Sequence, residues 1–423
     1  MSHTPLFLQV HTLTSYAATL LNRDDQGFAK RVPFGGVTRT RISSQCLKRH
    51  WRTYSGAHSM ASLMDGADPV TLSVRSRHTF ERFVVEPLVR DGVSEPLARA
   101  ATEAVMVAVL GESAKAKKAK EEAKEGDSKA KKRGAKKDDE GITPGLMTGQ
   151  ITVFGKPEID YFLSEARALA NAAGAPDKVE DAKKARFTKD WGKNLEGLKR
   201  ASGLDAALFG RMVTSDRLAR SDAAVHVAHA LTVHAEHAET DYFSAIDDLL
   251  RGGDGNDQLG SGHIGNTELT SGIFYGYVVV DVAQLVSNVE GCDPREWLKA
   301  DRKLSADVVH ALTHLVATVS PGAKLGSTAP YAFSHLTMLE AGSSQPRTLA
   351  NAFLKPVSGE RDLLGAAYAA LASYTKDVDS VFDLKNRRAL AAIGPKEVLA
   401  ELATPTTLDS VAKFAANAVL EHA

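Results

Sequence analysis

Cationic and hydroxyl-bearing side chains occur at unusual density near the beginning of the chain. Arg39 and Arg41 alternate within V-T-R-T-R-I (Val37–Ile42), a pattern typical of a strand, so both are expected to project from one face. Ser43 and Ser44 follow, and serine favours the N-terminal position of a helix. Free backbone amides at a helix N-terminus suit phosphate oxygens. This strand-to-helix junction therefore predicts a site for a phosphate-bearing ligand.

The helix expected over Gln45–Tyr54 adds more positive charge. Lys48 and Arg52 are four residues apart and so share one helix face, with Arg49 beside them. A basic helix face is most often simply solvated. Charge on a strand is less common, however, so the combination of strand arginines with this helix favours binding of a nucleic-acid backbone.

Strands and helices must both contribute to positioning this junction. A turn is expected at Pro33–Gly36, and strands are expected at Leu6–Tyr16 and Ile273–Val282. Helical patterns cover residues 75–112, Asp160–Ala173, Asp181–Leu208, Asp222–His234 and Ser305–Val319. Strands near both ends that bracket helical segments indicate the α+β class.

The bulk composition limits the possible functions. The 423 residues include 52 Lys+Arg and 52 Asp+Glu, which argues against a wholly cationic nucleic-acid binder but allows local patches. Cys46 and Cys292 are the only cysteines, so a disulfide framework is not expected and a cytoplasmic location is. We expect no signal peptide and no membrane association, because no apolar stretch approaches the roughly 18 residues that a span requires.

Patterns that could indicate a metal are incomplete. The segment H-A-L-T-H (His310–His314) has Ala311 where a zincin has glutamate, and Gly252–Asp257 is a single copy of a calcium repeat that needs stacked neighbours. A group of histidines lacks the cysteines or carboxylates of a standard site: His226, His229, His234 and His237. We therefore predict no cofactor and no metal.

Adjacent acidic residues near the junction suggest a second chemistry. Asp24 and Asp25 could hold Mg²⁺ for phosphodiester cleavage, although a local electrostatic role beside Arg23 is the commoner function of such a pair. Two lysine-rich stretches are also notable. Ser113–Glu140 has no large apolar side chain and is either a basic arm or a tolerated surface insertion. The second stretch contains Lys183, Lys184, Arg186, Lys189 and Lys193.

Taken as a whole, L-N-R-D-D…F-G-G…R-T-R-I-S-S-Q-C-L-K-R-H-W-R resembles the CRISPR-associated Cas-seven family, and more narrowly the CasC-type backbone subunit of type I-E Cascade. The resemblance continues in family order through Leu208–Asp216, Val227–His234, Thr240–Leu249, Gly262–Tyr275, Pro321–Phe333 and Leu349–Val357. These blocks span most of the chain, so the match does not rest on a single motif.

The resemblance implies a hand-like α+β fold. An RRM-like (ferredoxin-like) palm would carry a helical fingers insertion and a β-hairpin thumb. The corresponding ranges are 1–60 for the first part of the palm, 61–222 for the fingers with the lysine-rich insertion 113–140, 223–235 for a palm helix, 236–273 for the thumb, and 274–423 for the rest of the palm.

The resemblance also implies a function without catalysis. Family members polymerise as a helical filament along the guide crRNA, kink it periodically and present its bases to the target DNA strand. They work with the other Cascade subunits, and a separately recruited nuclease degrades the target. Because the guide sequence varies, such a subunit should grip phosphate and sugar rather than base edges.

Particular residues acquire roles from this resemblance. Arg23 and Lys30 would lie near the RNA path beside Arg39, Arg41, Ser43, Ser44, Gln45, Lys48, Arg49 and Arg52. Met212 falls on the position that wedges at the kink, and Tyr242 and Phe243 fall on the thumb position that packs against displaced nucleotides. A lysine-rich face that family members present to duplex DNA corresponds to Lys183, Lys184, Arg186 and Lys189.

Two other functions compete with the scaffold. A type III relative of the same superfamily would cleave target RNA with Asp24 or Asp25 and a metal ion. A generic RRM-like module would bind RNA alone, as a monomer, without length-dependent assembly.

Overall fold

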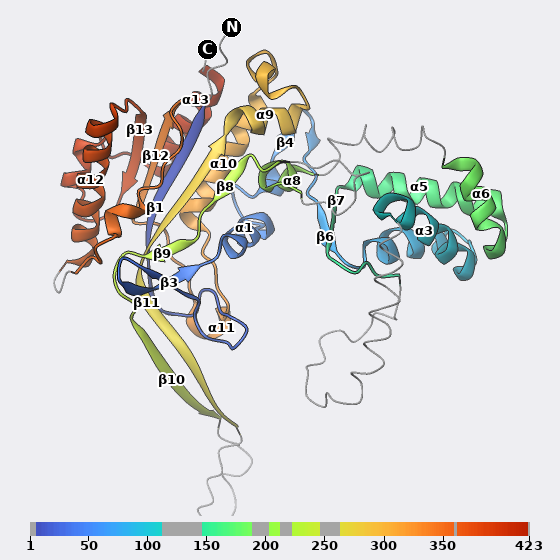
Figure 1. Cartoon of the computed structure of the whole chain (residues 1–423), viewed down its shortest axis with the longest axis horizontal. Helices are drawn as coiled ribbons and strands as arrows, with labels where there is room; N and C mark the ends of the chain where they lie inside the picture. Colours follow the sequence, from blue (N-terminus) through green and yellow to red (C-terminus); the bar gives the residue numbers. More distant parts are fainter. Residues whose placement is uncertain are drawn as a thin grey trace, which may run out of the picture. The chain divides into compact units, whose positions relative to one another are not determined.

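The computed structural model describes residues 6–111, 146–187, 203–211, 222–245, 263–358 and 362–421. It divides into two compact units (Figure 1). Unit 1 comprises Met1–Leu63, Val225–Ala283 and Asp301–Ala423, and unit 2 comprises Met64–Ala224 and Gln284–Ala300. We expected the chain to divide after residues 60 and 222. The structure divides it after Leu63 and Ala224 and also assigns residues 284–300 to unit 2.

Unit 1 is built on a nine-stranded sheet with antiparallel pairings. The strand order is β13-β12-β1-β11-β9-β3-β2, and β8 and β10 pair with β11 off this path. The bounds are β1 Phe7–Thr19, β2 Arg31–Phe34, β3 Val37–Ile42, β8 Val225–Val227, β9 Ala230–Thr232, β10 Ala238–Ala245, β11 His263–Asp281, β12 Leu336–Gly342 and β13 Arg387–Ala392.

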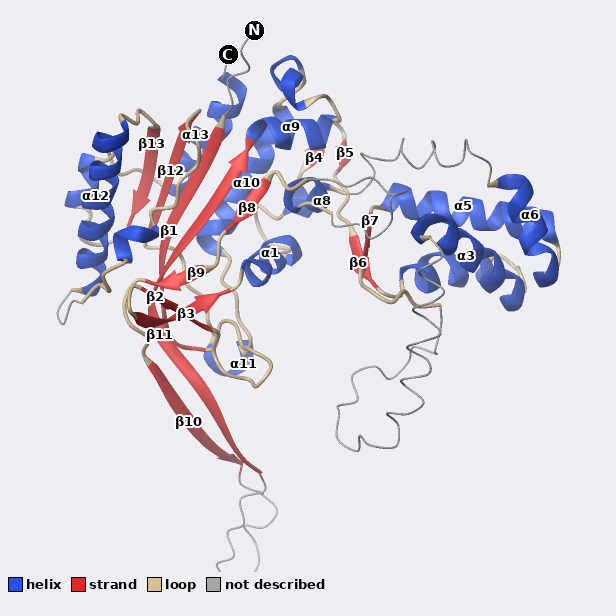
Figure 2. Ribbon diagram, in the orientation of Figure 1, coloured by secondary structure: helices blue, strands red, loops and turns tan. Residues whose placement is uncertain are grey.

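Helices cover both faces of this sheet (Figure 2). Leu13, Leu336 and Met338 share a core with α12, whereas Thr12 and Thr14, on the opposite face of β1, lie near Val316 of α10. The bounds are α1 Ser44–Thr53, α10 Lys303–Thr318, α11 Leu325–Thr328, α12 Leu363–Phe382 and α13 Leu408–Glu421, with 3-10 helices at Met60–Ser62, Ala350–Phe353 and Glu397–Glu401. Helix α9, Val282–Glu290, crosses from unit 1 into unit 2.

The strands predicted at both ends of the chain are confirmed as β1 and β11. The register joins Phe7 to Asp281 and continues to Tyr16 opposite Gly272, which makes these the central strands of the sheet. Residues 8–13 of β1 are all buried, because helices cover both of its faces. The predicted helices Gln45–Tyr54 and Ser305–Val319 are also confirmed, as α1 and α10.

The helix predicted over Asp222–His234, and assigned to the palm as 223–235, is wrong. This segment forms β8 and β9, which pair with β11 through Val280–Val225 and Phe274–Thr232. Its alanines suggested a helix, but β8 and β9 bury alternate side chains, with Ala230 and Thr232 buried and Leu231 between them half-buried. Pairing with the long central strand outweighs the local helix propensity.

The β10–β11 hairpin continues beyond the part of β11 that pairs with β1. Pairing between β1 and β11 ends at Thr19–Thr270, whereas β10 pairs with β11 from Ala238–Thr270 to Ala245–His263. The segment of β11 before Thr270 therefore has only β10 as its partner among the described strands. The described strands of this hairpin, β10 and the first part of β11, lie within the range 236–273 expected for a thumb.

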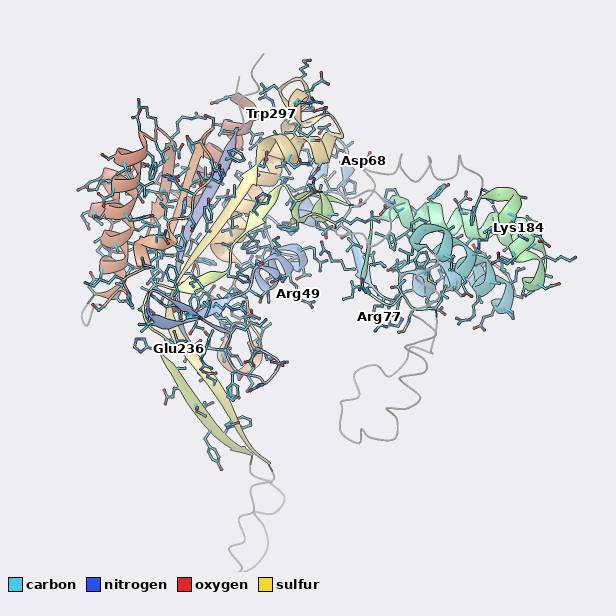
Figure 3. All side chains as sticks on the ribbon, in the orientation of Figure 1. Arg49, Asp68, Arg77, Lys184, Glu236 and Trp297 are labelled. Carbon is cyan, nitrogen blue, oxygen red and sulfur yellow. The ribbon has the colours of Figure 1, made fainter. Side chains whose placement is uncertain are left out.

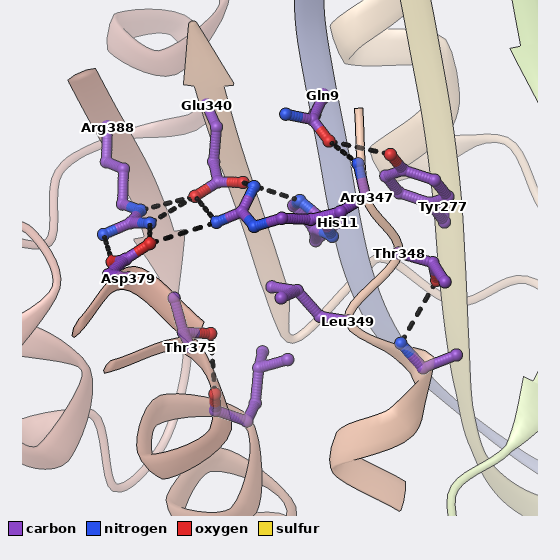
Figure 4. Close-up of polar contacts among 12 residues, drawn as sticks. Gln9, His11, Tyr277, Glu340, Arg347, Thr348, Leu349, Thr375, Asp379 and Arg388 are labelled. Carbon is purple, nitrogen blue, oxygen red and sulfur yellow. Dashed lines mark hydrogen bonds and ion pairs between the residues drawn. The ribbon is translucent and has the colours of Figure 1, made fainter. Parts of the chain in front are cut away.

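A buried polar network lies on the α12 side of the sheet (Figure 4). Glu340 of β12 is fully buried and binds the guanidinium groups of Arg347, at 2.7 Å, and Arg388, at 2.6 Å. Both arginines also bind Asp379 of α12. The interactions of Glu340 with His11, Arg347 and Arg388 hold the pKa of this carboxyl well below its usual range despite burial. Because both arginines also bind Asp379, the network fastens α12 to the sheet.

Unit 2 has a separate, mainly helical core. It is built largely from Phe80, Phe154, Phe162 and the apolar faces of α3 and α5, with three phenylalanine rings in mutual contact. The bounds are β4 Met64–Asp65, β5 Asp68–Pro69, β6 Val74–Ser76, a π-helix Glu81–Val85, α2 Glu86–Arg90, α3 Glu95–Leu110, β7 Thr152–Phe154, α5 Lys156–Ala173, α6 Val179–Arg186 and α8 Leu204–Phe209, with 3-10 helices at Pro176–Lys178 and Pro294–Lys299. Among the described residues, no helix is both long enough and apolar enough to cross a membrane.

Candidate nucleic-acid interface

The helix cap at the predicted junction forms as the sequence suggests. Ser43 has an extended backbone, and its hydroxyl accepts a hydrogen bond from the amide of Cys46 at 3.3 Å. The Ser43 amide donates to the side-chain oxygen of Asn22 at 2.9 Å. Because Ser43 is buried and its hydroxyl caps α1, its role is to fix the start of the helix.

His229 belongs to this junction, although the sequence singled it out only as one of four histidines in an incomplete metal pattern. It follows β8, and its Nδ1 accepts from the Ser44 amide at 3.2 Å and lies 3.4 Å from Nη1 of Arg41. Burial lowers the pKa of His229, and the charges of Arg41 and Lys30 lower it further. The imidazole is therefore neutral near pH 7. It accepts the hydrogen bond of the Ser44 amide, which was one of the amides expected to face phosphate.

The remaining cations surround the start of α1. Arg41 is half-buried, and its Nε donates to the Arg31 carbonyl at 3.3 Å, which leaves the guanidinium edge near His229. Lys30 is half-buried and Arg49 is exposed on α1 (Figure 3); both charges lower the pKa of Cys46 against the dominant effect of burial, which raises it. Positive potential therefore converges on the start of α1 from β3, from the turn before β2 and from the helix itself.

Other predicted contact residues border the same region. Gln45 is exposed, and its side-chain oxygen accepts from the Ser44 hydroxyl at 3.3 Å. Lys48 and Arg52 are half-buried, and each takes part in an interaction within the chain. Arg23 is exposed, and its backbone bridges to Ala29.

Arg39 does not join this surface, so its predicted exposure beside Arg41 is wrong. Its side chain is fully buried and donates to the backbone carbonyls of Phe34, Thr232 and Phe353 at 3.2, 3.0 and 2.7 Å. Arg39 and Arg41 point to the same face of β3, but the chain around Phe353 covers this face at Arg39. Arg39 therefore joins three segments of unit 1 and has no exposed edge for RNA.

The acidic pair beside the junction has a local structural role. Asp24 Oδ1 accepts from the amides of Gln26 and Phe28, both at 2.9 Å, and so closes the turn that leads into β2. Asp25 is exposed. The single grouping of three potential metal ligands in the described part of the chain lies elsewhere and contains neither aspartate.

The two predicted thumb aromatics lie on the β10–β11 hairpin. Tyr242 is 65% exposed, and Phe243 is 39% exposed. Phe243 lies opposite Gly265, and its ring is 5.2 Å from the Lys324 ammonium, which is the geometry of a cation–π contact. Since neighbouring strand residues face opposite ways, Tyr242 presents a ring on the other side of the hairpin.

The predicted duplex-binding residues on α6 are each paired with an acid. Lys183 Nζ lies 3.3 Å from Glu180, and Lys184 Nζ lies 3.3 Å from Asp181. Arg186 binds Glu165 of α5 at 2.8 Å. Lys184 nevertheless keeps 77% of its side chain exposed, so it is the most accessible of the three. Met212, Lys189 and the insertion 113–140 lie outside the described residues.

Two solved structures share this fold over nearly the whole chain. A chain of "CRISPR RNA-guided surveillance complex, pre-nicking" aligns with a TM-score of 0.71 and 24% identity, covering 97% of this chain and 100% of that chain. A chain of "CRISPR RNA-guided surveillance complex" aligns with a TM-score of 0.62 and 22% identity, covering 97% and 99%. By its fold, this chain is a mixed α/β protein with an antiparallel sheet, and it shares that fold with chains of these two structures.

The chain belongs to the CT1975-like protein family, whose model matches residues 8–416. No curated protein matches it. The family membership and the shared fold agree with a Cas-seven-type protein, which is the broader part of the resemblance found in the sequence.

Proposed function

We propose that this protein is a non-catalytic backbone subunit of a type I-E CRISPR surveillance complex and binds the sugar-phosphate backbone of crRNA. The observation that carries this proposal is the convergence of Lys30, Arg41 and Arg49 around the start of α1. The two structures compared above are RNA-guided surveillance complexes. A ligand with regularly spaced negative charges fits this region better than a small neutral molecule.

The same surface favours binding that ignores base sequence. Its cations come from a strand, a helix and the turn before β2, and long flexible Lys and Arg side chains suit phosphate oxygens. Tyr242 adds an exposed ring that can stack on any base. A protein that accepts every guide needs this combination of charge and stacking without base-edge readout.

The two units suit the parts of the proposed hand. The sheet of unit 1 would be the RRM-like palm, the β10–β11 hairpin its thumb, and unit 2 the fingers. In a helical filament on crRNA, each thumb would reach the neighbouring copy, and Lys183, Lys184 and Arg186 would face the target DNA. The other Cascade subunits would cap the filament.

The absence of catalysis is part of the proposal. Asp24 uses Oδ1 to hold two amides of its own turn, so only part of its carboxylate is available to a metal. A metal-dependent RNase using Asp24 or Asp25 remains the alternative function. Incubating the purified protein with target RNA and Mg²⁺ or Mn²⁺ separates the two: we expect intact RNA, whereas cleavage abolished by Asp25→Asn would establish the nuclease.

The central experiment is co-purification of guide RNA. The Arg41/Lys48/Arg52→Ala variant and the wild type are each co-expressed with the other complex subunits and a guide, and bound RNA is quantified by sequencing. Arg90/Arg295/Lys385→Ala removes the same number of charges from exposed sites elsewhere and serves as the matched control. We expect the wild type and the control to retain spacer RNA in a large complex and the variant to lose it.

Binding of single-stranded RNA to the isolated protein gives a quantitative form of this test. The slope of log K against log salt is negative, and each lost phosphate contact on a single strand reduces its magnitude by about 0.7, so the loss of three contacts reduces it by about 2. Equal RNA retention and equal slopes in variant and control would show that the cations of α1 and β3 serve another purpose.

A further inference from the structure

Three histidines from distant parts of the sequence meet in unit 1. His310 and His314 are one turn apart on α10, and His58 lies in the segment between α1 and the 3-10 helix Met60–Ser62. One ligand atom from each of the three lies within 4.8 Å of the others. The histidine cluster, as we call these three residues, is the only such grouping in the described part of the chain.

A carboxylate completes the cluster. Asp409 of α13 places Oδ1 3.4 Å from Nε2 of His310 and 3.9 Å from Nε2 of His314. Its other oxygen, Oδ2, is held by the Lys413 ammonium at 2.7 Å. Asp409 therefore aims one oxygen at two imidazole nitrogens while a neighbour on the same helix fixes its orientation, as outer-sphere partners do in metal sites.

His314 supplies the observation that points to a missing ligand. The residue is 9% exposed, and its Nε2 is buried without a hydrogen bond to any described residue. A buried nitrogen of this kind costs free energy unless something binds it.

We propose that the histidine cluster and Asp409 bind a Zn²⁺ ion. Imidazole nitrogen with one carboxylate is a donor set for borderline divalent metals, whereas Mg²⁺ and Ca²⁺ prefer oxygen alone. Two histidines at i and i+4 on one helix face are a common pair of zinc ligands. The site could not be recognised from the sequence. Ala311 replaces the glutamate of the H-E-x-x-H motif, and the other ligands, His58 and Asp409, lie about 250 residues before and about 100 residues after His310.

Forming the site requires a small local movement. Zn–N bonds of about 2.0–2.1 Å place tetrahedral ligands roughly 3.3–3.4 Å apart. The His58 and His314 rings now stack with centroids 3.8 Å apart and planes 4° from parallel, so no ion can lie in both ring planes. His58 is exposed and tilts most readily. The bound ion would join the segment after α1 to α10 and α13, and so hold the end of the helix that carries Lys48 and Arg52.

The test is zinc binding to the full chain, purified without a histidine tag. Metal content after equilibration with excess zinc and removal of free ions by gel filtration gives the stoichiometry. A chromophoric chelator gives the affinity, and Co²⁺ substitution reports tetrahedral ligation by its visible absorption. His58→Ala and Asp409→Asn change accessible side chains and so preserve the fold, which circular dichroism verifies. His237→Ala removes an exposed histidine outside the cluster and is the matched control.

We expect one zinc ion per chain, a melting temperature that rises with free zinc, and a tetrahedral cobalt spectrum. His58→Ala and Asp409→Asn should each weaken binding by at least the 10–100-fold typical of altered metal sites, whereas His237→Ala should not. Substoichiometric zinc, an octahedral cobalt spectrum, or equal affinity in the His58→Ala, Asp409→Asn and control proteins would overturn the proposal.

Discussion

At the scale of single residues, two arginines two positions apart on β3 have different environments: Arg39 is fully buried and Arg41 is half-buried. Arg39 and Arg41 were predicted to share a face and a ligand. Their burial differs because residues near Phe353 cover that face at Arg39. The hydrogen bond from Arg39 to the Phe353 carbonyl joins positions 314 residues apart. The alternation of side chains therefore predicted the basic strand correctly, but it could not predict that Arg39 is buried.

Arg39→Ala should lower the free energy of unfolding by roughly 3 kcal/mol, because it leaves three backbone carbonyls without their donor. Urea denaturation measures the change. Arg41→Ala is the control: its half-buried side chain donates to one carbonyl, so we expect a loss below about 1 kcal/mol. Equal losses in the two variants would show that the Arg39 contacts are not stabilising.

His11 predicts a dependence of stability on pH. Its Nδ1 faces the Tyr275 hydroxyl at 2.8 Å and its Nε2 faces Glu340 at 3.3 Å. Burial lowers the pKa of His11 although the bond to Glu340 opposes this shift, so the folded protein keeps the ring neutral. As pH falls below about 6.5 the unfolded chain takes up a proton that the folded chain does not.

The free energy of unfolding should therefore decrease as pH falls from 7 toward 5.5, by at most about 1.4 kcal/mol per pH unit from this group. His11→Gln removes the titration and should flatten this part of the profile. His237→Gln, at an exposed position, should leave it unchanged. A His11→Gln profile as steep as that of the wild type would assign the pH dependence to other groups.

At the scale of elements, the β2–β3 hairpin docks through its turn. Gly35 and Gly36 both have positive φ, +63° and +81°, as a tight two-residue hairpin turn requires. A methyl group on Gly35 would lie 1.7 Å from the Leu354 carbonyl oxygen, whereas one on Gly36 would meet nothing within 4 Å. The turn therefore fits against the chain that also receives Arg39.

Gly35→Ala and Gly36→Ala form a matched pair. Both introduce a side chain at positive φ, at a cost of about 1–2 kcal/mol. Gly35→Ala adds a clash with rigid backbone, so we expect a further loss of about 1–3 kcal/mol in the free energy of unfolding. Urea denaturation compares them, and hydrogen exchange in β2 and β3 should quicken more for Gly35→Ala. Equal losses would mean that the hairpin does not depend on this docking.

Most elements could be predicted from local pattern, and the failures share a cause. β1, β3, α1 and α10 have a side-chain period that matches their structure, so the sequence located them within a few residues. Residues 222–234 were misassigned because alanine favours helices locally, while pairing with β11 is a contact about 50 residues away in sequence. Local propensity cannot report such pairings.

At the scale of the whole molecule, the same limit applies to sites. The junction around α1 was visible because its cations are adjacent in sequence. His229 was not, since about 185 residues separate it from Ser44. The histidine cluster and Asp409 come from three distant segments and could be assembled only by the fold. A resemblance to a family locates sites that its members share, but not one formed by residues outside the shared motifs.

The two units have separate cores, so a core change in one should leave the other intact. Phe162 is fully buried in unit 2 and Leu371 is fully buried in unit 1. Truncation of either to alanine should cost about 2–5 kcal/mol of local stability. Hydrogen exchange resolved by peptide should then quicken in α3 and α5 for Phe162→Ala, and in β12, β13 and α12 for Leu371→Ala.

Function should follow the same division. Because Lys30, Arg41 and Arg49 all belong to unit 1, Phe162→Ala should retain affinity for single-stranded RNA within about threefold, and Leu371→Ala should lose more. Filter binding at fixed salt measures both. If Phe162→Ala quickens exchange throughout β1 and β11 and weakens RNA binding as much as Leu371→Ala, the chain unfolds as one cooperative body and the independence of its cores is refuted.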